Sequence, residues 1–184
     1  MVMKDNEMRN PKTGQDIKFL QTGKDTNGAL LEMEATYNSN SKEPASHYHP
    51  YQVEDFTVLK GELSVRINGE LKILKEGKTL HIDANTVHSM WNHKKGKTVV
   101  NWKVRPAMDT ENLLRTMTGL AIDGKTNKNG MPNVLQIALV ANKYSDVLRL
   151  SKPPFAFQKV LFAVLMPFSY LLGYRAVYKK YLSQ

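Results

Sequence analysis

The segment Ser-His-Tyr-His-Pro-Tyr-Gln-Val-Glu, residues 46–54, contains three side chains of the kind that bind metal ions. Residues two positions apart on a β-strand face the same side, so His47 and His49 direct both imidazoles toward one point. Glu54 lies five positions beyond His49, and an unbroken strand would turn it to the opposite face. Pro50 cannot donate a hydrogen bond to a neighbouring strand, so we expect a bend there that returns Glu54 to the side of the histidines.

A second segment supplies a fourth candidate ligand. Gly77 is followed by Asp-Ala-Asn at 83–85 and then by His88. Asp and Asn form turns readily, because their side chains bond to nearby backbone and tolerate left-handed angles. We expect a strand after this turn in which His88, Met90 and Asn92 share one face. If that face points inward, His88 meets the first three candidate ligands.

Short strands separated by turns are expected from about residue 29 to residue 106. Asn68-Gly69 stands between alternating runs at 62–67 and 70–74, and it predicts a two-residue hairpin because both positions tolerate positive φ. Further strands are expected over 16–20, 30–36 and 99–104. Many short strands with regular turn signals predict a mainly β protein, either a sandwich or a barrel.

Beyond Pro106 the pattern becomes helical. The expected helices run from Glu111 to about Leu120 with Thr110 as its cap, from near Pro132 to about Leu150, and from Phe155 to Tyr181 with a kink at Pro167. The chain is therefore expected to have two parts. Residues 1–106 form a β-barrel that includes the N-terminal strand, and residues 107–184 form a helical extension packed on the barrel or on a partner subunit.

The two segments resemble the two motifs of the cupin superfamily. The first motif, G-x5-H-x-H-x3,4-E-x6-G, is matched by His47, His49, Glu54 and Gly61, with Ser41 in place of the leading glycine. The second, G-x5-P-x-G-x2-H-x3-N, is matched by Gly77, His88 and Asn92, with Asp83 and Asn85 in place of its proline and second glycine. The whole chain also resembles a group of small bacterial single-cupin proteins that carry a C-terminal helical tail.

This resemblance spans about residues 30–105 and implies a double-stranded β-helix, the RmlC-like jelly-roll barrel, followed by C-terminal α-helices. It also implies a metal site. Three imidazoles and one carboxylate suit a divalent Fe, Mn, Ni, Cu, Co or Zn ion, and a six-coordinate ion would keep two positions for water, dioxygen or substrate. The implied ligands are His47, His49, Glu54 and His88.

Other side chains in these segments are candidates to surround the ion or line a pocket. They are Tyr48, Tyr51, Gln52, Met90 and Asn92, together with Trp91. Ordinary barrel packing is the favoured alternative for Met90 and Trp91. His81 and His93 fall outside both motifs, so we expect them at the surface or in turns.

Three functions remain open. The similarity to cupin dioxygenases of the quercetinase type implies a metal-dependent oxygenase acting on a small organic molecule. A non-enzymatic module that binds or senses a small molecule is the alternative, because a fold does not determine a function. A peripheral membrane protein whose tail matters more than its barrel is the third.

Composition limits the choice of partners. The chain has no cysteine, which excludes disulfides and thiolate metal sites. The net charge is +9, but the basic residues are spread out, so we expect no nucleic-acid partner. Residues 1–7 lack the apolar core of a signal peptide, so a cytoplasmic location is expected. The apolar segment 155–181 has basic flanks; packing within a homodimer or on the barrel is favoured, and contact with a membrane surface is the alternative.

Overall fold

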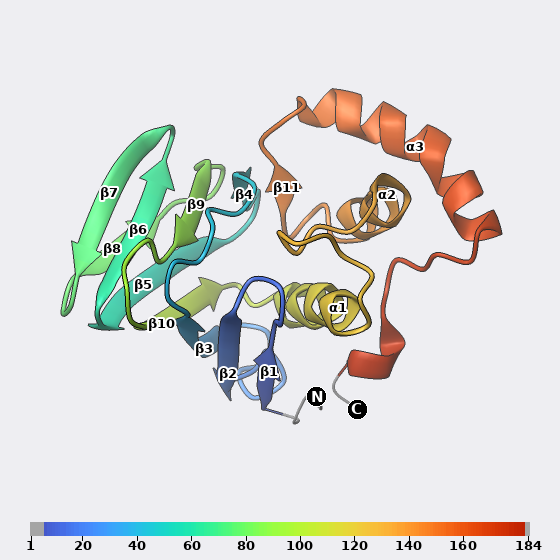
Figure 1. Cartoon of the computed structure of the whole chain (residues 1–184). Helices are drawn as coiled ribbons and strands as arrows, with labels where there is room; N and C mark the ends of the chain where they lie inside the picture. Colours follow the sequence, from blue (N-terminus) through green and yellow to red (C-terminus); the bar gives the residue numbers. More distant parts are fainter. Residues whose placement is uncertain (1–5, 183–184) are drawn as a thin grey trace.

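A computed structural model describes residues 6–182, over which two antiparallel sheets form a barrel with helices along one side (Figure 1). The six-stranded sheet has the order β1 (Glu7–Arg9), β2 (Gln15–Gln21), β3 (Leu31–Tyr37), β10 (Thr98–Arg105), β5 (Val53–Lys60) and β8 (Thr79–Ile82). The five-stranded sheet has the order β11 (Arg149–Leu150), β4 (His47–Tyr48), β9 (His88–Trp91), β6 (Glu62–Ile67) and β7 (Glu70–Lys75). The predicted jelly-roll with C-terminal helices is confirmed.

The strands place alternate side chains in the barrel interior. Along β3, Leu31, Met33 and Ala35 are buried, while the residues between them are only partly covered. The predicted hairpin is present between β6 and β7, where Asn68 has φ 48° and Gly69 has φ 93°. These two positive angles give the turn that matches the right-handed twist of the flanking strands. Strand β1 was not predicted from the sequence.

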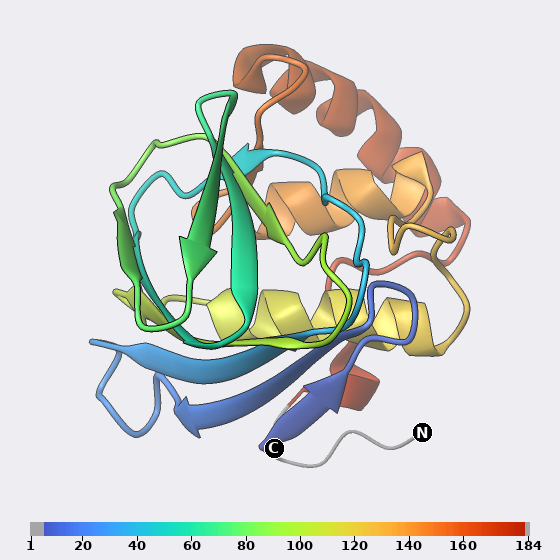
Figure 2. The same cartoon turned by 60° about the vertical axis from the view of Figure 1, so that its left-hand side comes forward.

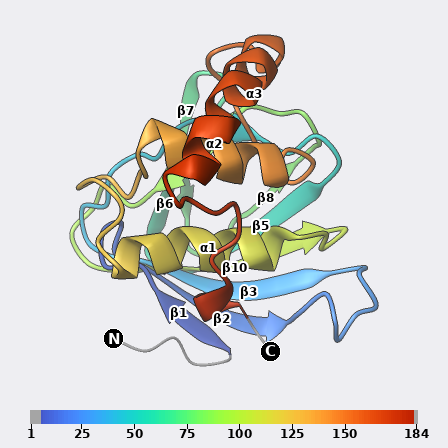
Figure 3. The same cartoon turned by 90° about the vertical axis from the view of Figure 1, so that its right-hand side faces the viewer.

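Three helices follow the barrel over the described residues: α1 (Thr110–Ile122), α2 (Val134–Lys143) and α3 (Phe155–Leu171), with a 3-10 turn η1 (Lys179–Tyr181) near the end. Figure 2 shows the helices along one side of the barrel, and Figure 3 shows α1 next to the sheet, α2 on α1, and α3 outermost. A second core, between α1, α2 and the turn after α2, is built from Leu113, Leu120, Val140, Tyr144 and Val147.

The predicted cap of the first helix was wrong. Asp109 occupies the N-cap position without a side-chain cap bond, and Thr110 is the first residue of α1. Thr110 is buried, and its hydroxyl accepts a hydrogen bond of 2.8 Å from the amide of Gln52. The Thr110 hydroxyl, which the sequence pattern had assigned to capping α1, therefore bonds to Gln52 of the barrel instead.

Both later helices end earlier than predicted. α2 stops at Lys143 instead of near Leu150, because Arg149 and Leu150 pair as β11 with the edge of β4. α3 stops at Leu171 instead of Tyr181, and Gly173 takes a positive φ of 84° just beyond its end. Pro167 lies inside α3 as expected. Among the described residues, no helix has the length and apolarity needed to cross a membrane.

Candidate metal centre

The four predicted ligands come from three strands and the bend that joins two of them. β4 ends at Tyr48 and β5 begins at Val53, so the chain leaves the sheet around Pro50, as the spacing had predicted. The backbone of Asn85, which has φ 64°, donates a hydrogen bond of 2.8 Å to the carbonyl of His49 and holds this bend from the second segment. His47 on β4 pairs directly with His88 on β9. The four ligand side chains thus face one space.

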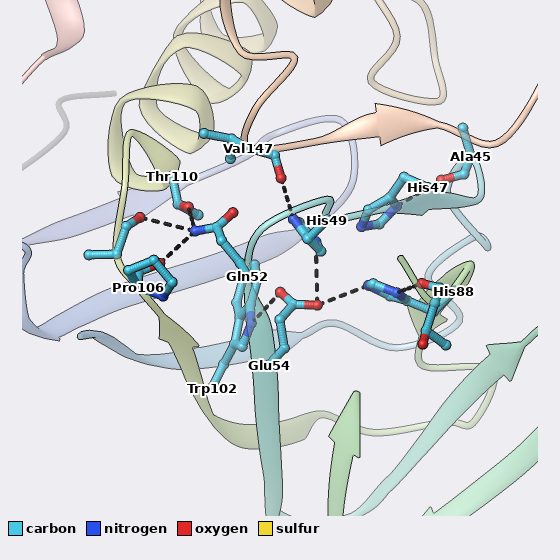
Figure 4. A network of polar contacts seen from close by, with 12 residues as sticks. Ala45, His47, His49, Gln52, Glu54, His88, Trp102, Pro106, Thr110 and Val147 are labelled. Atoms are coloured by element: carbon cyan, nitrogen blue, oxygen red, sulfur yellow. Dashed lines mark hydrogen bonds and ion pairs between the residues drawn. The ribbon is translucent and has the colours of Figure 1, made fainter. Parts of the chain in front are cut away.

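Each histidine ring is held by a backbone carbonyl (Figure 4). Nδ1 of His47 lies 3.1 Å from the carbonyl of Ala45, Nδ1 of His49 lies 2.6 Å from that of Val147, and Nδ1 of His88 lies 2.9 Å from that of Thr86. A carbonyl only accepts, so Nδ1 carries the proton in all three rings and Nε2 presents its lone pair. One ring nitrogen from each histidine lies within 4.8 Å of the others. This is the arrangement in which a metal-binding histidine is usually held.

One carboxylate oxygen of Glu54 lies close to two of these rings, and the other accepts a hydrogen bond that positions the side chain. Its Oε2 lies 2.9 Å from Nε2 of His88 and 3.3 Å from Nε2 of His49. Its Oε1 accepts a hydrogen bond of 2.9 Å from the indole Nε1 of Trp102. Among the described residues, Nε2 of His49 and Oε2 of Glu54 are buried and have no hydrogen-bond partner. Buried lone pairs that face each other need a proton or a metal cation between them, and this set of nitrogen and oxygen donors fits a divalent metal ion.

The electrostatics of the cluster also suit a metal ion. Burial, together with the neighbouring rings of His88 and His49, lowers the pKa of His47 to about 3. Burial alone would raise the pKa of Glu54, but the adjacent His49 and His88 outweigh it and lower the pKa to about 2. For His88, burial is outweighed by the Glu54 carboxylate, which raises the pKa of that ring. A bound cation would replace the proton that Glu54 otherwise draws onto His88.

The ligands open onto a cavity of about 490 Å³. Its apolar wall comes from both the barrel and the helical extension, and consists of Phe56, Met90, Trp102, Leu113, Leu114 and Leu148. Its outer part is polar and is formed by residues 11–15, residues 38–44, Lys128 and Asn129. The extension therefore supplies part of the space in front of the four candidate ligands.

A comparison with protein families matches a cupin domain over residues 33–102. The barrel is a cupin domain. Quercetin 2,3-dioxygenase of Bacillus subtilis (strain 168) is 31% identical over 78 residues, which are 42% of this chain but only 23% of that protein. An RmlC-like cupin from Shewanella frigidimarina is 18% identical with a TM-score of 0.49, and the match covers 57% of this chain and 87% of that one. KdgF from Halomonas sp. is 16% identical with a TM-score of 0.47, covering 56% and 90%.

Of the predicted pocket residues of the cupin barrel, Met90 lines the cavity. Tyr48 and Tyr51 do not, since Tyr48 pairs with Arg149 of β11 and the ring of Tyr51 is 59% exposed. The Gln52 amide donates to the carbonyl of Pro106 at 2.8 Å, which ties the bend to the start of α1 instead of to the pocket.

Asn92 stabilises a turn through its side-chain hydrogen bonds. Its amide donates to the carbonyl of Gly96 at 2.8 Å and its oxygen accepts from the backbone of Lys94 at 2.9 Å, so it closes the turn between β9 and β10. The three remaining residues lie away from the ligands. His81 pairs with Asp55 at 2.7 Å, the ring of His93 bonds to the Ser64 hydroxyl, and Trp91 is buried with the guanidinium of Arg66 5.6 Å from its ring.

Two contributors to the site were missed from the sequence. Trp102 had a signal, because it alternates with Val100 and Val104 on a predicted strand and so shares their inward face. The carbonyl of Val147 had none. Its contact with His49 depends on α2 ending early, which a helical pattern running to Leu150 conceals.

Proposed function

We propose that this cupin binds one divalent transition metal ion through His47, His49, Glu54 and His88 and acts as a metal-dependent oxygenase on a small organic molecule. One observation carries the proposal: three lone-pair nitrogens and a carboxylate converge on the wall of a largely apolar cavity. When bound, an ion of the Fe, Mn, Ni, Cu, Co or Zn group supplies Lewis-acid polarisation and, for the redox-active members, electron transfer toward dioxygen.

Glu54 serves better as a ligand than as a proton carrier. Its pKa of about 2 keeps the carboxylate ionised at neutral pH, whereas a general acid or base works best with a pKa near the operating pH. The indole of Trp102 donates to Oε1 of this carboxylate, so Oε2 is the oxygen that would hold the ion. The histidines are held in the ligating tautomer by carbonyls that cannot take part in proton transfer.

The cavity suits a small molecule with an apolar body. Its volume of about 490 Å³ lies within the range of sites for small ligands. The rings of Phe56 and Trp102 stack with their centroids 5.6 Å apart and form one wall, which contacts the substrate and excludes water. The named activity of the partial relative, a quercetin dioxygenase, is consistent with this substrate class.

Oxygen uptake tests the proposal. The full chain is loaded with Fe(II) without air, and in parallel with the other five metals, and is then exposed to phenolics, thiols and keto acids. We expect uptake by the native chain that is lost in His88→Ala. His81→Ala is the matched control, because His81 lies on the outer surface beside Asp55 and is expected to leave uptake unchanged.

Two results would contradict the proposal in different ways. Metal binding and thermal stabilisation by a metabolite without any oxygen uptake would favour the alternative function, a binding or sensing module. Failure of the native chain to take up any of the six metals would remove the metal centre itself.

A further inference from the structure

Helix α3 is oriented with its apolar face outward. Its buried side chains are Gln158, Phe162 and Ser169. Five large apolar side chains that it exposes lie along one face: Phe157 58%, Val160 67%, Val164 59%, Phe168 57% and Leu171 84%, while Lys159 and Tyr170 are exposed on another face. At 100° per residue these five fall within one stripe along the helix, opposite Gln158 and Ser169. We refer to these five residues as the α3 stripe.

Buried hydrogen bonds fix this orientation. The amide of Gln158 donates to the carbonyl of Leu150 at 2.8 Å and to that of Pro153 at 2.6 Å. The hydroxyl of Ser169 donates to the carbonyl of Leu135 on α2 at 2.9 Å. Turning the helix to bury the stripe would expose or leave unpaired both polar groups, which is costly. The stripe therefore faces outward as a consequence of the packing.

The position and length of α3 suit a flat surface. α3 is the outermost element, lying on α2 and away from the barrel (Figures 1 and 3). With 17 residues it is about 25 Å long, which is shorter than the hydrocarbon core of a bilayer, and Pro167 interrupts it. An outermost helix with one exposed apolar stripe fits an orientation parallel to a membrane surface.

The charges near the α3 stripe distinguish between two kinds of partner, a second copy of this chain and a lipid surface. No Asp or Glu occurs in residues 147–184. Lys152 lies just before α3 and Arg175 lies just beyond its end, and both are exposed. Lys159 is also exposed, about 100° around the helix from Val160. Two copies of this chain meeting through α3 would bring like charges together, whereas an anionic lipid surface attracts them.

We propose that α3 docks this protein on anionic membranes, with the α3 stripe inserted at the level of the lipid headgroups and the flanking basic residues paired with acidic phospholipids. This surface is separate from the metal centre, and the inference does not depend on the proposed function.

Flotation of the full chain with vesicles tests it. Vesicles of phosphatidylcholine alone are compared with vesicles containing phosphatidylglycerol, at low and at high salt. We expect flotation with the anionic vesicles, weakened by salt. Val164→Ser with Leu171→Ser should lower the vesicle partition coefficient about 100-fold, because each loses the transfer of one aliphatic side chain, roughly tenfold.

The matched control is Leu71→Ser with Ile73→Ser. These side chains are also exposed, at 54% and 41%, but they lie on β7 at the far side of the barrel. Thermal melting of each variant verifies that it is folded. Unchanged flotation of the stripe variant, or no flotation of the native chain on anionic vesicles at low salt, would overturn the proposal. Self-association that the stripe variant abolishes, without vesicle binding, would assign the stripe to a second copy.

Discussion

Trp102→Phe separates the positioning of Glu54 from the packing of the cavity wall. The indole Nε1 donates to Oε1 of Glu54 at 2.9 Å, and its ring stacks on Phe56 with 20° between the planes. Phenylalanine keeps an aromatic ring in the wall but has no donor. The substitution therefore leaves a buried carboxylate oxygen without its partner, while most of the apolar contact remains.

The expected loss can be estimated in two ways that agree. A hydrogen bond to a charged group contributes about 1.5–3 kcal/mol. Residues that orient metal ligands typically change metal affinity about 10–100-fold when they are replaced, which corresponds to about 1.4–2.7 kcal/mol. We therefore expect Trp102→Phe to bind a divalent metal about 10–100-fold more weakly than the native chain.

Competition titration against a chelator of known affinity measures this change for each of the six candidate metals. Trp91→Phe is the matched control, because Trp91 is also buried but stacks on Arg66 outside the cavity. Equal metal affinity in Trp102→Phe and in the native chain, with both proteins folded, would refute the role assigned to this indole. An equal loss in Trp91→Phe would show that the effect reports general packing.

The remaining predictions concern the pH dependence of metal binding, the backbone conformation at Asn85, and the ionisation of Asp123. Metal affinity is expected to fall as pH drops toward and below about 6.5, because Glu54 raises the pKa of His88 above its usual 6.5 and the proton on that ring competes with the metal, whereas His47 stays neutral down to about pH 3; calorimetric titration at several pH values checks this. Asn85→Ala, at φ 64°, should lower the free energy of unfolding by about 1–2 kcal/mol in urea titration, and Asn85→Gly by less. Hydrogen bonds from Tyr181 and Tyr178 lower the pKa of Asp123 to about 2. That contribution is present above about pH 4 and is lost toward about pH 2, so the difference in melting temperature between the native chain and Asp123→Asn should shrink over that window.

The ligand geometry could be read from the sequence because it depends on local rules. Side-chain alternation placed His47 and His49 together, and the missing donor of Pro50 predicted the bend that brings in Glu54. Asn68 and Gly69 predicted their hairpin through backbone angles alone. In each case the deciding interaction lies within a few residues of the signal.

What the sequence did not reveal depends on contacts between distant segments. The strand β11 is two residues long and exists because the edge of β4 accepts it. The orientation of α3 depends on where Gln158 and Ser169 find acceptors, and an apolar pattern alone favours burying the stripe. The predicted partners of residues 107–184, a second subunit in particular, stay predictions.

Residues 147–150 of the helical extension contact two of the candidate metal ligands. The carbonyl of Val147 sets the tautomer of His49 from 2.6 Å away, and Leu150 pairs with His47 on the adjacent strand. Gln158 of α3 in turn binds the carbonyl of Leu150. The segment 147–150 therefore links the outermost helix to two of the four candidate ligands. Any force that moves α3 acts on a segment that also holds the candidate ligands His47 and His49 in place, so the barrel motifs alone do not define the geometry of this site.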